Sequence, residues 1–348
     1  MFAVRVENRF AEEVRRCLAT KNLVDNTHKI RIDGKYVEIP IVRKLKRTEV
    51  AGFRGYPLGV IKLETIENRI LQPTPFEEIS RETNLPKSQS KHLPRKWELI
   101  GDVLILKIPD KLRSVEKRVG EVYASVVGAK TVLIDSCDIR GTTREPTTRT
   151  IYGNDTETTH IENKVRFKLD VAKIMFSSGN IHERERMAYV SNRNETVADM
   201  FAGIGYFSIP IAVHSKPKRI YTAEINPTAY GYLCTNIRLN KVANVVIPLL
   251  GDCRKEMPEN IADRVIMGYL HDTWKFLPKA VRVIGKNGGI IHYHEKCHDK
   301  LIKNRSMDLL KLIHKESGQK PILLKLHNIK SYSPHISHIV MDILVKKR

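Results

Sequence analysis

Cysteine is scarce in this sequence, with five copies among 348 residues. They are Cys17, Cys137, Cys234, Cys253 and Cys297. The count is odd, the spacing is irregular and no CxxC motif occurs, which argues against both a disulfide framework and a zinc ribbon. This usage suits a reducing cytoplasm.

One segment near the C-terminus resembles a metal site, because histidines cluster around Cys297. His292 and His294 follow Gly288–Ile291, which reads as a strand, and side chains two apart in a strand share a face. Two such histidines at a strand end are more typical of side chains that line a site or form hydrogen bonds. We therefore expect no metal.

Long apolar runs are also missing. No stretch approaches the roughly 18 continuous apolar residues that a membrane span needs. The first residues, Met1–Glu7, lack the apolar core of a signal peptide. Hydrophobic residues still make up 41% of the chain, which suffices for a sizeable core and excludes a disordered protein. We expect a soluble cytoplasmic protein of two or three domains, with no membrane partner, and a monomer is favoured.

Acidic residues are fewer than basic ones: the chain has 39 Asp and Glu and 60 Lys and Arg, which gives a net charge of +21. Such a surplus repels itself, and a polyanion such as nucleic acid would relieve the repulsion. The alternative to a polyanion partner is that the basic residues keep the surface soluble or reflect the lysine-rich composition of some thermophilic proteins. The charge favours nucleic-acid binding.

Residues 1–55 read as a small basic α+β module. A helical pattern over 11–23 precedes two strand-like segments, 29–33 and 36–41, joined by a turn at Gly34. A cluster of basic residues follows, which is either an RNA-contacting surface or a solvated face: Arg43, Lys44, Lys46, Arg47 and Arg54.

Two segments lead to the C-terminal block. Residues 56–100 are rich in Pro, Glu, Lys and Ser, which predicts a linker with room for short helices. Residues 101–180 read as an α+β domain for RNA or substrate binding. Its expected elements are strands at 102–109 and 131–134, a helix over 112–127 and a polar loop at 140–146.

Residues 181–348 alternate strands with helices, which is the pattern of a parallel, doubly wound α/β sheet. Five strands are expected, at 197–200, 219–224, 245–249, 263–267 and 289–294. Two more, at 322–326 and 336–345, follow one another without room for a helix. A Rossmann-like sheet with a terminal antiparallel pair is typical of class I S-adenosylmethionine-dependent transferases.

Glycines and acids lie where a nucleoside ligand needs them, at the carboxyl ends of the strands. Gly203 and Gly205 allow close backbone approach, Glu224 can accept both ribose hydroxyls, and Asp252 can accept from the adenine amino group. A dinucleotide is disfavoured, because Ser208 interrupts the G-x-G-x-x-G pattern. These residues predict an S-adenosylmethionine site.

Three motifs carry a family resemblance: Asp199–Gly205, Glu224–Pro227 and Asn240–Val242. They resemble the archaeal and eukaryotic enzymes that modify the guanosine 3′ to the tRNA anticodon. That superfamily contains guanosine-37 nitrogen-1 methyltransferases and the aminocarboxypropyltransferases of the wybutosine pathway. The resemblance is clear from residue 101 onward and extends to 1–55 in some members.

Two positions separate the branches. The methyltransferases carry Phe-Ser-Pro-Arg where this chain has Phe176–Asn180, and Asn-Leu-Pro where it has Gly268–Leu270. Both departures match the aminocarboxypropyltransferases. An asparagine at 268 could help to orient a purine nitrogen, and a glycine cannot.

The resemblance implies roles at matching positions. Ser177 and Arg184 would contact the S-adenosylmethionine, Glu224 its ribose, and Asp252 with Cys253 its adenine, Cys253 through its backbone rather than as a nucleophile. A guanidinium suits the carboxylate of the amino-acid arm, although Arg184 in its charged run can also be a surface residue.

The reaction side and the RNA contacts complete this set. Asn180, Glu183 and Tyr269 are expected to line the reaction side as catalytic candidates, with individual roles left open. Arg144 resembles a family arginine that contacts tRNA, and a plain loop charge is the alternative.

The implied reaction moves the 3-amino-3-carboxypropyl group of S-adenosylmethionine to carbon-7 of 4-demethylwyosine, at position 37 in the anticodon loop of tRNA(Phe), and releases methylthioadenosine. Which sulfonium carbon reacts depends on which one faces the nucleophile in line. Methylation of guanosine-37 at nitrogen-1 and a non-catalytic tRNA-binding role are the alternatives.

Overall fold

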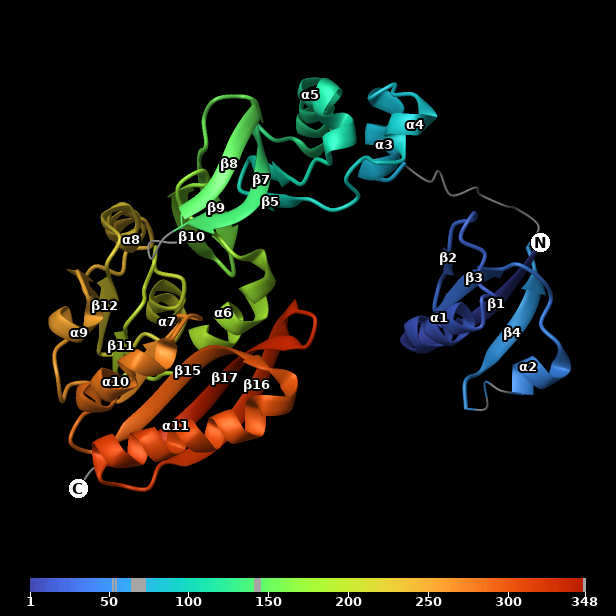
Figure 1. Ribbon diagram of the computed structural model, residues 1–348. Coiled ribbons are helices and arrows are strands. Elements are labelled where there is room, and N and C mark those ends of the chain that lie inside the picture. The colour runs from blue at the N-terminus through green and yellow to red at the C-terminus, as the bar shows by residue number, and fades with distance from the viewer. Residues whose placement is uncertain (52, 54, 64–72, 141–144, 347–348) are drawn as a thin grey trace. The chain divides into compact units, whose positions relative to one another are not determined.

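The computed structural model describes residues 1–348 apart from 52, 54, 64–72, 141–144 and 347–348 (Figure 1). The chain divides into two compact units, residues 1–77 and 78–348.

The first unit is a four-stranded antiparallel sheet with one covering helix. The strand order is β2-β3-β1-β4, with β1 at Phe2–Glu7, β2 at Arg31–Asp33, β3 at Tyr36–Ile41 and β4 at Leu58–Lys62. Helix α1 (Ala11–Thr20) buries Val14 and Leu18 in the core of this sheet, and a short α2 spans Arg47–Ala51. The predicted helix and hairpin are confirmed, and Gly34 has the positive φ that the turn requires.

The structure corrects the predicted linker at 56–100. Strand β4 pairs with β1 along its whole length, from Phe2 opposite Lys62 to Val6 opposite Leu58, so it belongs to the first sheet. Helices α3 (Pro75–Glu82) and α4 (Lys87–Ser90) and strand β5 (Glu98–Ile100) follow. A five-residue strand containing Gly59 has too weak a pattern to be recognised without its partner.

The second unit begins with a four-stranded sheet in the order β5-β6-β7-β8. Its remaining strands are β6 at Val103–Leu106, β7 at Thr131–Arg140 and β8 at Glu145–Tyr152. β6 and β7 are parallel, and the crossover between them holds a 3-10 turn at Asp110–Val115 and helix α5 (Glu116–Val127). A hairpin of β9 (Glu157–Glu162) and β10 (Val165–Asp170) leads to the large sheet.

The large sheet has seven strands in the order β13-β12-β11-β14-β15-β17-β16. They are β11 at Thr196–Asp199, β12 at Arg219–Glu224, β13 at Val246–Leu250, β14 at Arg264–Met267, β15 at Gly289–His298, β16 at Ile322–Ser333 and β17 at Ile336–Val345. The first five are parallel, and β17 runs antiparallel to β15 and β16. This confirms the predicted class I Rossmann-like fold with its terminal antiparallel pair.

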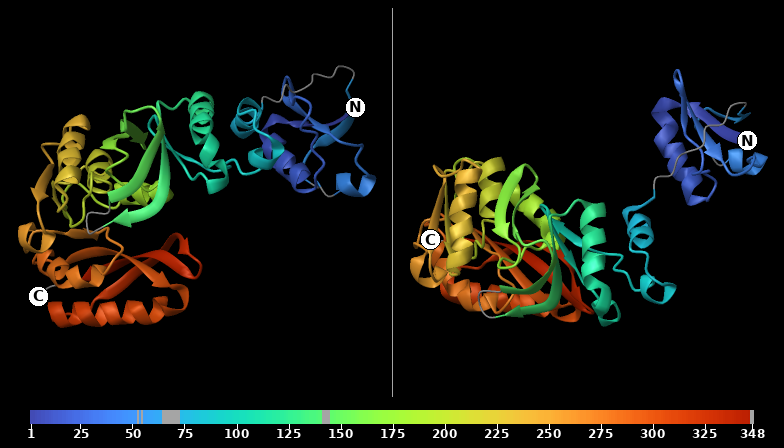
Figure 2. Two further views of the ribbon diagram at one scale, coloured as in Figure 1. Left: turned by 45° about the horizontal axis from the view of Figure 1, so that its top comes forward. Right: turned by 90° about the horizontal axis from the view of Figure 1, so that it is seen from above.

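Helices cover both faces of the sheet (Figure 2), because alternate strand residues point to opposite sides. Val197 packs into a core with α7 and α8, whereas its neighbour Ala198 packs into the core of α10 and α11. The helices are α6 at Ile181–Ala188, α7 at Ser208–His214, α8 at Pro227–Leu239, α9 at Cys253–Glu256, α10 at Leu277–Val283 and α11 at Ile302–Ser317. Asn226 caps α8, with its side chain accepting from Thr228 N and Ala229 N, and Pro227 occupies the first turn.

The boundary predicted at residue 181 is also corrected. Phe167 and Leu169 of β10 lie in one hydrophobic core with Val197 of β11, and Val103 and Leu133 of the preceding sheet join the same core. Residues 101–180 therefore share their core with the large sheet and do not form a separate domain.

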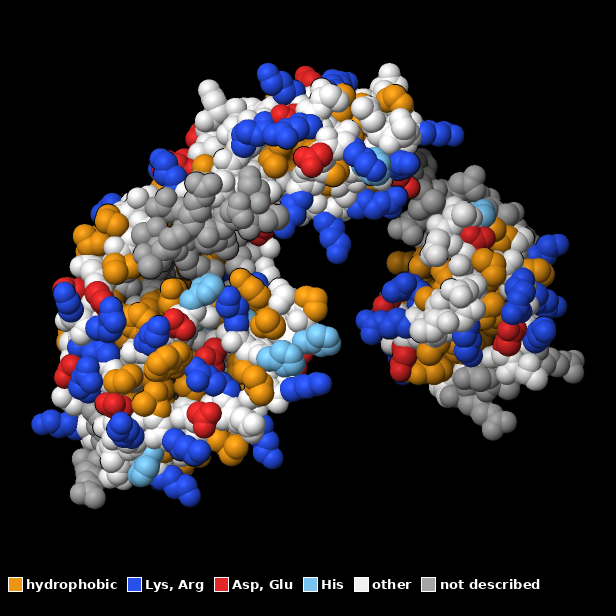
Figure 3. All heavy atoms as spheres, viewed as in Figure 1, with side chains coloured by type: hydrophobic (Ala, Val, Ile, Leu, Met, Phe, Trp, Pro, Cys, Tyr) orange, Lys and Arg blue, Asp and Glu red, His pale blue; other side chains and the backbone are white. Residues whose placement is uncertain are grey.

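The surface carries the positive charge broadly. In Figure 3 the Lys and Arg side chains are distributed over the visible faces of both units and are not collected in one patch. In the part of the chain that the structure describes, no helix is long and apolar enough to cross a membrane.

Candidate active site

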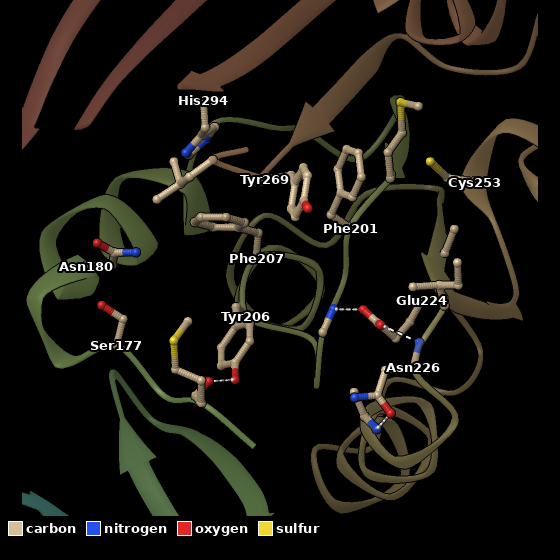
Figure 4. A pocket seen from close by; sticks show the side chains of 18 of the residues that line it. Ser177, Asn180, Phe201, Tyr206, Phe207, Glu224, Asn226, Cys253, Tyr269 and His294 are labelled. Atoms are coloured by element: carbon tan, nitrogen blue, oxygen red, sulfur yellow. Dashed lines mark hydrogen bonds between the residues drawn. The ribbon is translucent and has the colours of Figure 1, made fainter. Parts of the chain in front are cut away.

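A cavity of about 440 Å³ opens at the carboxyl ends of β11, β12 and β14, beside the point where the strand order reverses (Figure 4). This is where open parallel sheets bind their ligands. Predicted site residues that line it are Ser177, Asn180, Arg184, Gly203, Glu224, Asp252, Cys253 and Tyr269. Gly205 and Glu183 are not among the lining residues.

The two glycines of the loop after β11, Gly203 and Gly205, have different structural roles. Gly203 has φ +57° and lines the cavity, and a Cβ there would lie 2.5 Å from the Tyr206 ring. Gly205 has φ +99°, and a Cβ there would meet Ile209 and Leu233 at 2.4 and 3.2 Å. A side chain at position 205 would therefore disturb helix packing, and the predicted ligand contact of Gly205 stays a prediction.

Glu224 at the end of β12 is held by the backbone on both sides. Its carboxylate accepts from Gly203 N at 2.7 Å and from Asn226 N at 2.7 Å. Burial raises its pKa, and these two hydrogen bonds oppose the rise. A carboxylate fixed in this way keeps acceptor sites for a pair of vicinal hydroxyls.

The end of β13 forms the next wall. Asp252 caps the short helix α9 by accepting from Arg254 N, and it pairs with the Arg254 guanidinium at 2.6 Å. Arg254 lies over the Phe276 ring at 4.8 Å. Burial raises the pKa of the Cys253 thiol to about 12, so this thiol stays protonated and is a poor nucleophile.

Aromatic rings form the wall above β14. Tyr269 stacks on Phe201 with ring centroids 5.1 Å apart, and Phe276 meets Phe201 edge-on. At Gly268 a Cβ would lie 2.8 Å from the Phe207 ring. The space that a side chain at 268 would need is therefore filled by this phenylalanine.

Ser177 and Asn180 lie at the other end of the cavity, away from Glu224 and Cys253 (Figure 4). Lys330 reaches this end from β16 and donates to Ser177 Oγ at 3.0 Å. The buried Oδ1 atom of Asn180 has no hydrogen-bond partner among the described residues. This end of the cavity thus combines a cation with an unsatisfied acceptor.

Arg184 has a different setting from the one predicted. Its guanidinium is buried, pairs with both carboxylate oxygens of Glu162 at 2.7 and 2.5 Å and donates to the Ser177 carbonyl at 2.7 Å. It also lies over the Phe176 ring. Glu162 already balances its charge, so Arg184 holds the Ser177 loop in place more than it offers a free counter-ion.

Glu183 is buried behind the cavity wall. It pairs with Arg186 at 2.7 Å, and its Oε1 lies 3.8 Å from Nε2 of His294, which does line the cavity. Burial raises the pKa of Glu183, and Arg186 opposes the rise. Glu183 thus lies one layer behind the residues that line the cavity, and its role on the reaction side stays a prediction.

The lining residues that the sequence analysis did not predict include Phe207, Lys330 and His338. Lys330 and His338 come from the terminal antiparallel strands, about 150 residues after Ser177, and only strand pairing brings them here. The sequence allows His294 either to line a site or to form hydrogen bonds, and in the structure it does both, lining the cavity and sharing a hydrogen bond with His338. His292 forms the hydrogen bonds, to Asp342 at 2.6 Å and to Arg264 at 2.7 Å.

The predicted RNA-contacting residues lie mostly in the first unit. Lys44 and Lys46 are exposed, and Arg43 is exposed but pairs with Glu49 at 2.7 Å. Arg47 lies in α2, whereas Arg54 and Arg144 fall outside the described residues. Within the described ranges no group of three or more His, Cys, Asp or Glu side chains is arranged to hold a metal ion.

The strand order, the glycine loop and the acids that end β12 and β13 define a class I S-adenosylmethionine-dependent transferase. Comparison with known proteins narrows the class. Residues 158–322 match the TRM5/TYW2 methyltransferase domain, residues 77–156 the TYW2 N-terminal domain, and residues 3–49 the tRNA methyltransferase 5 N-terminal domain. The chain belongs to the TRM5/TYW2 family.

Three relatives illustrate its place in that family. The tRNA(Phe) (4-demethylwyosine(37)-C(7)) aminocarboxypropyltransferase of Methanocaldococcus jannaschii is 48% identical over 71% of this chain and 96% of the relative. The crystal structure of P. horikoshii TYW2 in complex with MeSAdo has 42% identity and a TM-score of 0.71, covering 78% of this chain and 98% of that one. The Pyrococcus abyssi tRNA (guanine(37)-N(1))-methyltransferase Trm5b is 35% identical over 99% of this chain and 98% of the relative.

Proposed function

We propose that this protein transfers the 3-amino-3-carboxypropyl group of S-adenosylmethionine to carbon-7 of 4-demethylwyosine at position 37 of tRNA(Phe), with release of methylthioadenosine. The observation that carries the proposal is the 48% identity to an aminocarboxypropyltransferase over nearly all of that relative. Gly268 supports it further, because the Phe207 ring fills the place where a methyltransferase would carry its asparagine side chain.

At the nucleoside end, Glu224 accepts both ribose hydroxyls while the Gly203 and Asn226 backbone amides hold its carboxylate. Asp252 and the backbone at Cys253 bind the adenine, and Arg254 keeps Asp252 ionised, since this ion pair holds the pKa of Asp252 below its usual value. With the nucleoside held in this way, the sulfonium would lie between the glycine loop and the aromatic wall.

At the opposite end, Ser177 and Lys330 hold the amino-acid arm. Lys330 places a positive charge beside Ser177 Oγ, where the carboxylate of the arm would lie, and Arg184 pairs with Glu162. Arg184 acts through Ser177, whose carbonyl oxygen accepts its hydrogen bond. Anchoring the arm here turns its γ-carbon, and not the methyl group, toward the incoming base.

The reaction is then mainly a matter of positioning. Carbon-7 of the tricyclic base is an electron-rich, enamine-like carbon that needs little activation, and alignment of it with the carbon–sulfur bond supplies most of the rate enhancement. Tyr269, stacked on Phe201, offers a flat surface for a base that has left the anticodon loop.

Basic residues outside the cavity bind the tRNA. Arg43, Lys44, Lys46 and Arg47 of the first unit, together with Arg144, would contact its phosphates, which suits the net charge of +21. In this proposal the protein acts in the cytoplasm as a monomer on the anticodon loop.

Product identification tests the proposal. Purified protein and S-adenosylmethionine are incubated with tRNA(Phe) carrying 4-demethylwyosine and, in parallel, with unmodified tRNA(Phe). Mass spectrometry then reads the small leaving molecule and the digested nucleosides. Methylthioadenosine together with a base heavier by an aminocarboxypropyl group is expected. S-adenosylhomocysteine together with a methylated guanosine would refute the proposal in favour of a guanosine-37 methyltransferase.

A further inference from the structure

Two buried histidines stand at the end of the cavity where the base must react. His294 of β15 and His338 of β17 are each 1% exposed, and both line the cavity. Nδ1 of His294 lies 3.2 Å from Nε2 of His338, so the two rings share one hydrogen bond. Their outer atoms, Nε2 of His294 and Nδ1 of His338, have no partner in the described part of the chain.

The strand register explains how the pair forms. His294 lies opposite Val340 and Lys296 opposite His338, so the two histidines are diagonal neighbours on one face of the antiparallel β15–β17 pair. On the same face His292 lies opposite Asp342 and bonds to it. His294 therefore lies between His292, whose ring nitrogens both have hydrogen-bond partners, and His338, whose Nδ1 has none among the described residues. The centroid of the His294 ring lies 5.2 Å from that of Phe207.

Both rings are neutral at pH 7. Burial lowers the pKa of His294 well below its usual value and lowers that of His338 to about 4. Two neutral imidazoles that share one hydrogen bond leave one outer nitrogen as a donor and the other as an acceptor. Moving a proton through the shared bond exchanges these two roles, which is the property of a proton relay.

This inference rests on the proposed function, which requires a proton acceptor after the transfer step. Carbon-7 donates its electron pair to the γ-carbon, the carbon–sulfur bond breaks, and neutral methylthioadenosine leaves. The base is then a cation that still carries the hydrogen on carbon-7. Loss of this proton returns the carbon–hydrogen electron pair to the ring and restores aromaticity.

We propose that Nε2 of His294 accepts the carbon-7 proton and that His338 takes the Nδ1 proton of His294 in turn. A weakly basic imidazole suffices, because restoration of aromaticity drives the proton transfer. Glu183 stabilises the imidazolium that forms, because its Oε1 lies 3.8 Å from Nε2 of His294. When the product leaves, water takes the proton from Nε2 of His294 and the Nε2 proton of His338 returns to Nδ1 of His294, so both rings regain their starting tautomers.

The test compares His294→Asn with wild type, because asparagine retains a hydrogen-bonding group near Nδ1 but has nothing at Nε2. Each protein is given S-adenosylmethionine and tRNA(Phe) whose 4-demethylwyosine carries hydrogen or deuterium at carbon-7. Single-turnover rates and the affinity for S-adenosylmethionine are measured. His335→Asn is the matched control, since His335 is exposed at the turn between β16 and β17 and has a positive φ that asparagine accepts.

We expect His294→Asn to bind S-adenosylmethionine as wild type does and to lose about 100-fold in single-turnover rate. A primary deuterium isotope effect appears in this variant and is absent from wild type, because proton loss becomes the slow step. His338→Gln is expected to lose about tenfold, with an isotope effect of its own, since it keeps a partner for His294 but passes no proton on. The control retains the wild-type rate.

A wild-type rate in His294→Asn, or a slower rate without any isotope effect, would overturn the relay while leaving the proposed function intact. Wild-type protein that forms no aminocarboxypropyl product on either tRNA would overturn the proposed function and the relay together. The wild-type product alone therefore distinguishes the two failures.

Discussion

The two ends of the cavity differ in how their polar atoms are satisfied. At the nucleoside end, Glu224 and Asp252 accept hydrogen bonds from nearby residues of their own motifs. At the reaction end, Asn180, His294 and His338 each keep a buried polar atom without a partner among the described residues. Unpaired buried polar atoms are costly to stability, so the three that belong to residues lining the cavity mark where a substrate completes the site.

The difference teaches that binding and chemistry are divided between the ends. The nucleoside end is preorganised before any ligand arrives, which limits the entropy lost on binding. The reaction end is completed only by the base and the amino-acid arm. Changes at the first end should alter the affinity for S-adenosylmethionine, and changes to the unpaired polar atoms of the second end should alter the transfer rate.

The largest effect is expected from Glu224→Ala, which removes a buried charged acceptor from the nucleoside end. Affinity for S-adenosylmethionine should fall about 100-fold or more, because hydrogen bonds to charged groups contribute about 1.5–3 kcal/mol each. Isothermal titration calorimetry measures this change. Glu185→Ala, on the exposed face of α6, is the control. Equal affinities of the two variants for S-adenosylmethionine would contradict the assignment of nucleoside binding to this end of the cavity.

Gly268→Asn tests the aromatic wall between the two ends. The new Cβ would start 2.8 Å from the Phe207 ring, so this ring must move, and overpacking typically costs about 1–3 kcal/mol. We expect the aminocarboxypropyl transfer rate to fall about tenfold or more, and mass spectrometry of the tRNA measures it. Gly231→Ala is the matched control, because Gly231 lies in α8 with open space around its Cβ position. An unchanged rate in Gly268→Asn would contradict the idea that Phe207 excludes a side chain here.

Asn180→Ala addresses the reaction end alone. The unpaired Oδ1 atom of Asn180 can accept a hydrogen bond from the substrate. Removing this atom should lower the single-turnover rate about tenfold, as expected for one hydrogen bond of about 1 kcal/mol or more. Affinity for S-adenosylmethionine should change little, and calorimetry beside the rate assay checks this. Loss of affinity without loss of rate would reverse the assignment of the two ends.

The last prediction concerns stability and not activity, at the acid beneath the nucleoside end. Burial raises the pKa of Asp199 to about 7, above its usual 3.8. Because the folded protein then binds the proton more tightly than the unfolded chain, this group makes stability fall as pH rises from about 4 to 7, by up to about 1.4 kcal/mol per pH unit. Urea denaturation of wild type and Asp199→Asn at pH 5, 6 and 7 measures the difference, and parallel stability curves for the two proteins would contradict the shift.

Much of the nucleoside end is readable from the sequence because its residues are close together along the chain. The glycine loop follows β11 directly, Glu224 ends the next strand and Asp252 the one after, so alternating strands and helices are enough to bring them to one edge. The prediction of a linker at 56–100 was wrong because the evidence for β4 is not local: β4 forms a strand through its pairing with β1, which lies more than 50 residues earlier. Short strands carry little signal of their own.

The sequence by itself determined the order of the sheet elements, the glycine turn, the acids of the nucleoside site and the family resemblance, since all of these are encoded in local spacing. Only the tertiary structure decided that Glu162 neutralises Arg184, that Phe207 fills the space beside Gly268 and that His294 meets His338. Each of these contacts joins segments distant in the sequence or depends on how side chains fill a shared volume. No local pattern encodes such contacts, because pairing register and packing are properties of the folded chain.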